Sequence, residues 1–266
     1  MHTKKLKGPI ADLDVKHRSL LFAELATLAY TEKANATKEA KKLGFTTVEY
    51  YNIAGAQAYR FMNKVDFVIA CRGTEPTQFN DIKADLNAIP TKSETVSYVH
   101  SGFKEEVDKI WPRLVDDISR EADKRTVWFC GHSLGAAMAT IVASRCTGSK
   151  DCPNPAELYT YGSPRVGFKK YVKSEPITHY RWVNNNDIVT RVPMWIMGYR
   201  HDGERMYLNT YGNVRKMGKW QRFKDRWRGL WLGIKKGKID SFSDHSMTNY
   251  VDYINTWAEG KENPQK

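Results

Sequence analysis

Four short apolar runs constrain the fold of this chain more than any other feature. They are continuous rather than alternating and lie between segments of helical pattern: VDFVIAC (65–71), TVWFC (126–130), LYTYG (158–162) and ITHYRWV (177–183). Continuous runs of this length are typical of strands buried on both faces, as in a parallel sheet. Strands that alternate with helices indicate an α/β architecture.

Apolar residues at three- and four-residue steps predict two helices. The first lies in SLLFAELATLAYTEK (19–33), where Leu21, Leu25 and Leu28 share one stripe. The stripe of the second consists of Phe103, Val107, Ile110, Leu114 and Ile118. Pro112 falls inside it and predicts a kink or a helix start, because proline interrupts helical hydrogen bonding. No linker rich in Pro, Gly or Ser divides the chain, so we expect a single domain over residues 1–266.

The positive charge of the chain is local. The whole sequence carries a formal net charge of +12, from 42 Lys and Arg against 30 Asp and Glu. Between residues 215 and 238 there are ten basic residues and one acidic residue, so this segment alone carries +9. A charge confined to one segment argues against a nucleic-acid partner, which calls for a broader basic surface.

Targeting signals and cysteines constrain the cellular context. No apolar run approaches the roughly 18 residues of a membrane span, and no secretory signal peptide is visible, so we expect a cytoplasmic or membrane-peripheral protein. Four cysteines do not make a disulfide scaffold. Cys71 and Cys130 end putative core strands and are expected to be buried free thiols. Cys146 and Cys152 could close a small loop, and this stays open.

The run WFCGHSLGAAMATIVASR carries the strongest chemical signal. A predicted strand leads into Gly131-His132-Ser133-Leu134-Gly135, and a helix rich in small residues follows. In this context G-x-S-x-G is a nucleophile elbow, a sharp turn that exposes the serine hydroxyl above the sheet. The N-terminus of the helix favours negative charge beside Ser133, as an acyl-transfer intermediate requires. His132 is expected to brace the turn rather than to react.

A serine hydroxyl needs a base and an orienting acid, and in this architecture the chain order is Ser, Asp or Glu, then His. The histidines after Ser133 are His179, His201 and His245. His179 lies within a predicted strand, whereas His245 lies in a loop that enters a helix. Asp187 follows the strand 177–183, at the carboxyl edge where ligands of parallel sheets bind. We therefore predict the triad Ser133–His245–Asp187.

The oxyanion of an acyl-transfer intermediate needs N–H or O–H donors. The run VIACRGTE ends a predicted strand, and Gly73 permits a tight turn that directs the Thr74 N–H, and its hydroxyl, over Ser133. The other donor is expected to be the N–H of Leu134, the residue after the nucleophile. No Cys/His cluster has the spacing of a zinc site, so we predict no metal.

Together these residues resemble the class 3, fungal-lipase-like lipases. The resemblance runs from about residue 20 to 255 in family order, through CRGTEPTQFNDIKADL, VHSGF, GHSLGAAMA, YTYGSPRVG, VNNNDIVTRVP and DHSMTNY. GHSLG alone occurs in many esterases, whereas RGT, YGSPRVG and NDIV-x-R-x-P together are much more specific.

This resemblance implies an α/β-hydrolase fold, with a mostly parallel central sheet and helices on both faces. It implies Ser133 as nucleophile, Asp187 and His245 as its partners, and Thr74 with Leu134 as the oxyanion hole. It also implies lipid-like acyl-ester substrates and no metal or organic cofactor.

Family members often place an amphipathic lid after the oxyanion turn, and residues 75–89 are the candidate here. The apolar residues of this segment are spaced three, four and three apart: Phe79, Ile82, Leu86 and Ile89. The stripe is poor in aromatic residues and crowded by acidic and basic ones, so it fits a lid or a fixed wall equally well. Asp85 is a candidate ion-pair partner for Arg72, which would brace the oxyanion turn.

We therefore predict a serine carboxylester hydrolase that cleaves lipid-like acyl esters through an acyl-enzyme. A phospholipase A1 and a soluble short-chain esterase are alternatives with the same chemistry, since a fold does not select a substrate. A nonenzymatic membrane-binding protein with a relic site is the alternative from another class.

The basic segment predicts an interfacial helix. In KWQRFKDRWRGLWLGIKK (219–236), one helical face carries Trp220, Phe223, Trp227, Trp231 and Ile234, and basic residues surround it. A basic helix with an aromatic stripe is typical of binding to an anionic membrane surface. The alternative is that the aromatic face packs on the core while the charges are solvated.

Overall fold

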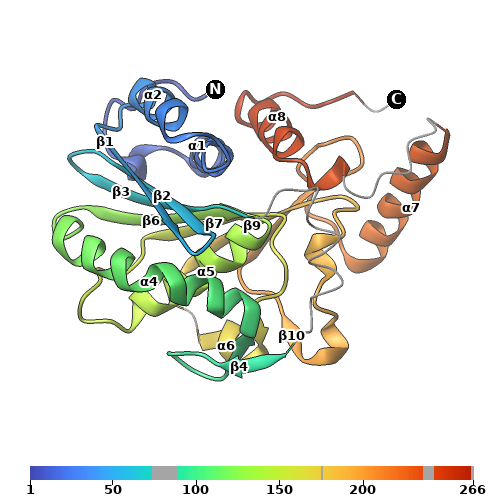
Figure 1. Ribbon diagram of the computed structural model, residues 1–266. Helices are drawn as coiled ribbons and strands as arrows, with labels where there is room; N and C mark the ends of the chain where they lie inside the picture. The colour runs from blue at the N-terminus through green and yellow to red at the C-terminus, as the bar shows by residue number, and fades with distance from the viewer. Residues whose placement is uncertain (74–88, 175, 236–242, 265–266) are drawn as a thin grey trace.

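The computed structural model describes residues 1–73, 89–174, 176–235 and 243–264, and its centre is a seven-stranded sheet (Figure 1). The strand order is β1-β2-β3-β6-β7-β9-β11. The bounds are Thr47–Ile53 (β1), Ala56–Met62 (β2), Asp66–Cys71 (β3), Thr126–His132 (β6), Glu157–Tyr161 (β7), Thr178–Asn184 (β9) and Glu204–Leu208 (β11). The five strands from β3 to β11 are parallel.

The four strands predicted from continuous apolar runs are all present, as β3, β6, β7 and β9, and they pair in parallel as expected. Sequence reasoning missed the edges of the sheet. The hairpin β1–β2 is antiparallel and turns at Ala54 and Gly55, which both have positive φ. β1 is only partly buried, so it lacks the continuous apolar run that marks a central strand.

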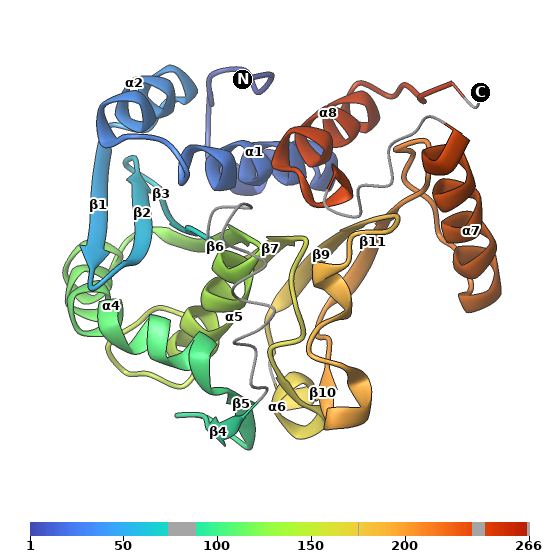
Figure 2. The same cartoon turned by 45° about the vertical axis from the view of Figure 1, so that its right-hand side comes forward.

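Helices cover both faces of the sheet, α1, α2 and α8 on one and α4 and α5 on the other (Figures 1 and 2). Their bounds are Val15–Leu28 (α1), Lys33–Leu43 (α2), Ser101–Glu121 (α4), Leu134–Thr147 (α5) and Met247–Ala258 (α8). The remaining helices are α6 (Lys169–Ser174) and α7 (Lys219–Lys235), with the short 3-10 turns η1 (Ile10–Asp12), η3 (Val189–Arg191), η4 (Trp195–Met197) and η5 (Ser243–His245). The α/β-hydrolase fold predicted from the sequence is confirmed.

A second, small sheet lies below the main one, with the order β10-β8-β5-β4. Its strands are Tyr199–Arg200 (β10), Gly167–Phe168 (β8), Tyr98–His100 (β5) and Pro90–Lys92 (β4), and all of its pairings are antiparallel. Within the described segments, no helix has both the length and the apolar composition needed to cross a membrane.

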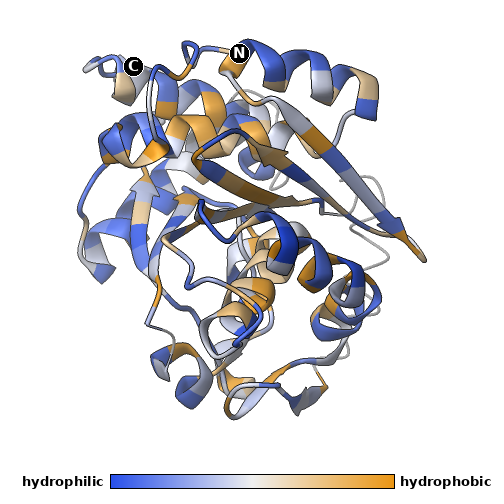
Figure 3. Cartoon of the chain, turned by 90° about the vertical axis from the view of Figure 1, so that its left-hand side faces the viewer, coloured by the Kyte–Doolittle hydropathy of each residue, from blue (hydrophilic) through white to orange (hydrophobic). Residues whose placement is uncertain are grey.

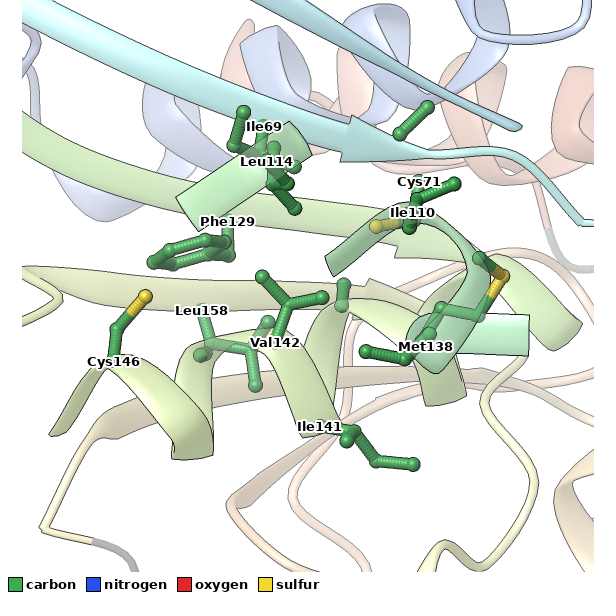
Figure 4. Packing of buried hydrophobic residues seen from close by; sticks show 14 of the residues in the cluster. Ile69, Cys71, Ile110, Leu114, Phe129, Met138, Ile141, Val142, Cys146 and Leu158 are labelled. Carbon is green, nitrogen blue, oxygen red and sulfur yellow. The ribbon is translucent and has the colours of Figure 1, made fainter. Parts of the chain in front are cut away.

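The hydrophobic core consists of two clusters, one on each face of the sheet, because successive side chains of a strand point to opposite faces. In β6, Val127 and Phe129 pack with α4 and α5, whereas Trp128 and Cys130 pack with α1 and α8. Figure 4 shows Phe129 among side chains of α4, α5 and β7. Figure 3 shows hydrophobic residues gathered in the central strands and in the helix turns beside them. This packing holds the carboxyl ends of the parallel strands rigidly in place.

α4 corrects one sequence expectation. The helix begins at Ser101 and continues through Pro112 to Glu121, so a helix start at Pro112 is wrong. Its five predicted stripe residues are all buried, and their packing offsets the helical hydrogen bond that the proline cannot donate.

The four cysteines are free and buried, so Cys146 and Cys152 do not close the small loop. The two thiols lie within hydrogen-bonding reach of each other, and this contact, together with burial, raises the pKa of Cys146. Cys71 and Cys130 are the buried core thiols expected from the sequence.

Candidate active site

The turn from β6 to α5 places Ser133 in a strained backbone conformation. Ser133 has φ 58° and ψ −129°, a region that side-chain-bearing residues rarely adopt. The flanking glycines make the turn possible, because a Cβ on Gly131 would overlap the carbonyl of Gly135, and one on Gly135 would overlap the carbonyl of Cys71. Such strain at a strand–helix turn is the geometry of a nucleophile elbow.

His245 and Asp187 form a buried pair. The Nδ1 atom of His245 lies 2.9 Å from Asp187 Oδ2 and 3.0 Å from Oδ1, although the residues are 58 positions apart. Asp187 is fully buried and follows β9, and His245 ends η5 at the entry to α8. An imidazole that donates from Nδ1 presents Nε2 as the acceptor for a serine proton.

Tyr250 of α8 fixes the carboxylate, and sequence reasoning missed it. Its hydroxyl donates to Asp187 Oδ2 at 2.7 Å and accepts from the N–H of Asn184 at 2.9 Å. Burial and the charge of Asp187 raise the pKa of Tyr250, which keeps the hydroxyl protonated and donating. The backbone N–H of Val189 donates to Asp187 Oδ1 at 2.9 Å. The DHSMTNY motif contains Tyr250 five residues after His245, and that proximity was the available signal.

His132 braces the elbow, as expected. Its Nε2–H donates to the backbone carbonyl of His245 at 2.8 Å, and its Nδ1 accepts from the Tyr30 hydroxyl at 2.9 Å. Burial lowers the pKa of His132 well below its ordinary value, so the ring is neutral and serves as donor and acceptor at once. The serine turn and the base therefore share one hydrogen-bonded support.

The backbone at Gly162 brings the serine turn and the buried pair together. The N–H of Ser133 donates to the carbonyl of Tyr161 at 3.1 Å, and Gly162 follows directly. A Cβ on Gly162 would lie 2.7 Å from both Asp187 Oδ2 and His245 Nδ1. The structure thus places the three predicted triad residues at one edge of the sheet. The Ser133 hydroxyl oxygen is buried and has no hydrogen-bond partner within the described part of the chain.

Leu134, one of the two predicted oxyanion donors, directly follows Ser133. Leu134 is the first residue of α5, where a helical N–H has no partner four residues earlier in the helix. Thr74 lies outside the described residues. Its neighbour Gly73 is described, and a Cβ there would lie 3.2 Å from the Cβ of Ser133. The chain that leaves β3 therefore passes directly beside the serine.

Comparison with known proteins shows which family this chain resembles. The family model of class 3 lipases matches residues 68–197, which include the elbow and Asp187. Over this segment, just under half of the chain, the protein is similar to class 3 lipases. The resemblance seen in the sequence motifs is thereby confirmed.

Three known proteins show how far the similarity extends. Toxin TseL of Vibrio cholerae is 30% identical over 194 residues, which cover 56% of this chain and 30% of the toxin. The lipase of Rhizomucor miehei is 34% identical over 135 residues, covering 47% of this chain and 37% of that lipase. The chain thus spans about a third of the length of these relatives. A solved triacylglycerol lipase, described as having a catalytic centre formed by a serine protease triad, has the same fold (TM-score 0.61, 24% identity, 71% of this chain and 78% of that chain).

Three other buried or partly buried histidines make contacts away from the serine turn. His179 in β9 lies between Thr160 and Asp202, at 2.7 and 3.2 Å, and His201 donates from Nε2 to a backbone carbonyl at 2.7 Å. His100 stacks on Phe103 with ring centroids 4.2 Å apart, and burial lowers its pKa to about 4. None of them pairs with a carboxylate beside the serine turn.

The lid candidate 75–89 lies outside the described residues, except for Ile89, which is exposed. Asp85 also lies outside them, so its expected pairing with Arg72 stays a prediction. The Arg72 guanidinium donates to Gln57 Oε1 at 2.6 Å. Among the described residues, no group of three or more His, Cys, Asp or Glu side chains could hold a metal ion.

Proposed function

We propose that this protein is a serine carboxylester hydrolase that cleaves lipid acyl esters through an acyl-enzyme. The observation that carries the proposal is the buried His245–Asp187 pair beside the strained turn of Ser133. The match of residues 68–197 to the class 3 lipase family supports it, as does the shared fold with a triacylglycerol lipase.

Each residue has a defined part in the proposed reaction. Ser133 Oγ attacks the ester carbonyl carbon while His245 Nε2 takes the hydroxyl proton, and Asp187 stabilises the imidazolium. The Leu134 N–H donates to the oxyanion, with Thr74 proposed as the second donor. When the tetrahedral intermediate collapses, the C–O bond to the alcohol breaks and His245 returns the proton to the leaving alkoxide. A water then loses a proton to His245 and attacks the acyl-enzyme. When this second intermediate collapses, the C–O bond to Ser133 breaks and His245 returns the proton to Ser133 Oγ, releasing the fatty acid.

Covalent labelling tests the chemistry directly. A fluorophosphonate probe should label the wild type, and Ser133→Ala should be folded, unlabelled and inactive. Asn35→Ala, at an exposed position of α2, is a control that should be labelled like the wild type. An unlabelled but folded wild-type protein would overturn the proposal and favour the nonenzymatic alternative.

A substrate panel separates the lipase from its alternatives. The panel consists of p-nitrophenyl esters of increasing chain length, a diacylglycerol and a phospholipid, each with and without a lipid interface. A preference for long-chain esters at an interface supports a lipase. Hydrolysis confined to soluble short-chain esters supports an esterase, and a preference for the phospholipid supports a phospholipase A1. The triad is the same in each case, so the panel decides the substrate and not the mechanism.

We also propose that the enzyme works at an anionic lipid surface, which it reaches through residues 215–238. This segment holds +9 of the net charge of +12. Each Lys or Arg near such a surface contributes about 1 kcal/mol of attraction. Sedimentation with anionic vesicles should therefore be strong at low salt and weaken as salt is added, and binding that ignores both lipid charge and salt would refute this part of the proposal.

A further inference from the structure

We infer that α7 and a basic groove at its base form one docking surface for an anionic bilayer. In this surface the guanidinium groups of Arg205 and Arg222 hold lipid phosphates, and the aromatic side chains of α7 enter the headgroup region. The inference rests on the proposed function only in taking a lipid surface as the place where the substrate is found.

The aromatic stripe of α7 points away from the protein. Trp220, Phe223, Trp227 and Trp231 are 65%, 50%, 53% and 59% exposed. The alternative that this face packs on the core is therefore wrong for these four side chains, while the Ile234 side chain lies outside the described part. Exposed aromatic residues on one helix face are the composition of an interfacial helix.

Buried polar contacts hold α7 in this orientation. Asp225 is 3% exposed and accepts from Asn185 Nδ2 at 3.0 Å, from the Tyr207 hydroxyl at 2.9 Å and from the N–H of Thr210 at 3.1 Å. These bonds lie on the inner face, so hydrogen bonds anchor the helix on the side opposite the exposed aromatic residues. In Figure 2, α7 stands beyond β11, the edge strand of the sheet. The exposed stripe is thus a fixed feature of the fold.

A groove of about 440 Å³ lies where β11 meets the start of α7. Its basic side chains come from three segments: Arg205 from β11, Arg215 and Lys216 from the connection, and Arg222 from α7. Arg205 is outside the basic segment 215–238, and only the fold brings it there. Glu204 is the acidic residue among those that line the groove.

The charges in the groove are incompletely compensated. Arg215 pairs with Glu262 at 2.7 Å, and Arg222 donates to the carbonyl of Met217. The backbone of Arg205 pairs with β9, but its guanidinium group forms neither a hydrogen bond nor an ion pair with any described residue. Burial, and then the charges of Arg222 and Arg226, lower the pKa of Arg205, which means that like charges meet there. A phosphate would relieve this repulsion and accept hydrogen bonds from the guanidinium groups.

The combination of features favours a bilayer over a soluble anion or a nucleic acid. Arg222 and the aromatic stripe belong to the same helix, so a ligand that fills the groove also meets exposed tryptophans. A bilayer offers phosphates and an apolar layer within a few ångströms of each other, whereas a free phosphate offers no apolar part. Four consecutive exposed apolar residues, at positions 194–197, lie in the segment that follows Asp187.

Docking through α7 fixes the catalytic edge relative to the lipid. Arg226 donates from Nε to the carbonyl of Asn185 at 3.2 Å, and Asn186 Nδ2 donates to the carbonyl of Arg226 at 3.0 Å. These two asparagines directly precede Asp187. The surface that binds the headgroups is therefore in direct contact with the turn that carries the catalytic acid.

The test measures binding to vesicles of phosphatidylcholine, with and without 30% phosphatidylglycerol, at constant ionic strength. Arg205→Gln combined with Arg222→Gln should weaken binding to the anionic vesicles about 30-fold, about fivefold for each charge. Lys38→Gln combined with Lys41→Gln is the matched control, because it removes the same charge from an exposed face of α2, and it should change binding less than twofold. Trp220→Ala combined with Trp227→Ala should weaken binding to both kinds of vesicle.

Three outcomes would overturn the inference. In the first, the double arginine variant and the double lysine control variant weaken vesicle binding equally. In the second, the double tryptophan variant binds vesicles like the wild type. In the third, inorganic phosphate alone saturates the groove in a titration without lipid. Hydrolysis of a soluble short-chain ester should be unchanged in every variant, which also shows that each is folded. A wild type that binds vesicles but hydrolyses no ester would refute the proposed function and leave the docking surface standing.

Discussion

Gly162 offers a test of the site that does not touch a triad residue. Its φ is +59°, and a Cβ there would lie 2.7 Å from Asp187 Oδ2 and from His245 Nδ1. Ordinary van der Waals contact begins near 3.4 Å, so Gly162→Ala must displace both of these atoms by about 0.7 Å. The backbone cannot retreat easily, because the N–H of Gly162 donates to the carbonyl of Trp182 at 3.1 Å.

The size of the effect follows from the geometry. Moving both atoms outward by about 0.7 Å lengthens the His245–Asp187 contact from 2.9 Å to about 3.6 Å, where it is no longer a hydrogen bond. A misplacement near 1 Å in a catalytic group costs about 100-fold in rate, or about 2.7 kcal/mol. We therefore expect Gly162→Ala to lower kcat about 100-fold on a soluble ester, with a much smaller change in KM.

Gly55→Ala separates this effect from backbone strain. Gly55 has φ +86° in the β1–β2 turn, and no atom lies within 4 Å of its added Cβ. Both variants should lose about 1 to 2 kcal/mol of stability from placing alanine in a left-handed conformation. Steady-state kinetics measures kcat, and urea unfolding measures the free energy of unfolding. Wild-type kcat in Gly162→Ala, or an equal loss of kcat in Gly55→Ala, would refute the reasoning.

Three further predictions concern the supports of the site. Tyr250→Phe removes the O–H donor to Asp187 and should lower kcat about tenfold and the free energy of unfolding by about 2 kcal/mol in urea titrations; unchanged values would contradict the assigned contact. Burial raises the pKa of Asp244 to about 6, so the folded state holds its proton above the usual Asp range and loses stability as pH rises from 4 to 6. Asp244→Asn should therefore gain stability relative to the wild type between pH 4 and pH 7 in denaturant titrations, and a constant difference would count against this. Gly135→Ala should destabilise the fold by about 3 kcal/mol, measured by thermal unfolding, because its Cβ overlaps the carbonyl of Cys71.

The basic segment shows why a local sequence pattern could not predict whether the aromatic face of α7 is buried or exposed. Periodicity places Trp220, Phe223 and Trp227 on one face of a helix, but it does not say whether that face is covered. The answer depends on Asp225, whose partners Asn185, Tyr207 and Thr210 come from other parts of the chain. Their hydrogen bonds turn the polar face of α7 inward.

The sequence alone determined the parallel strands, the serine turn and the order of the triad candidates. Central strands and tight glycine turns impose local requirements on residue type, and so they leave a readable pattern. The pairing of His245 with Asp187, the Tyr250 support and the place of Arg205 beside Arg222 were decided by the tertiary structure. Residues separated by tens of positions meet only after the strands are ordered and the helices are packed, because these contacts depend on distance in space and not on spacing along the chain.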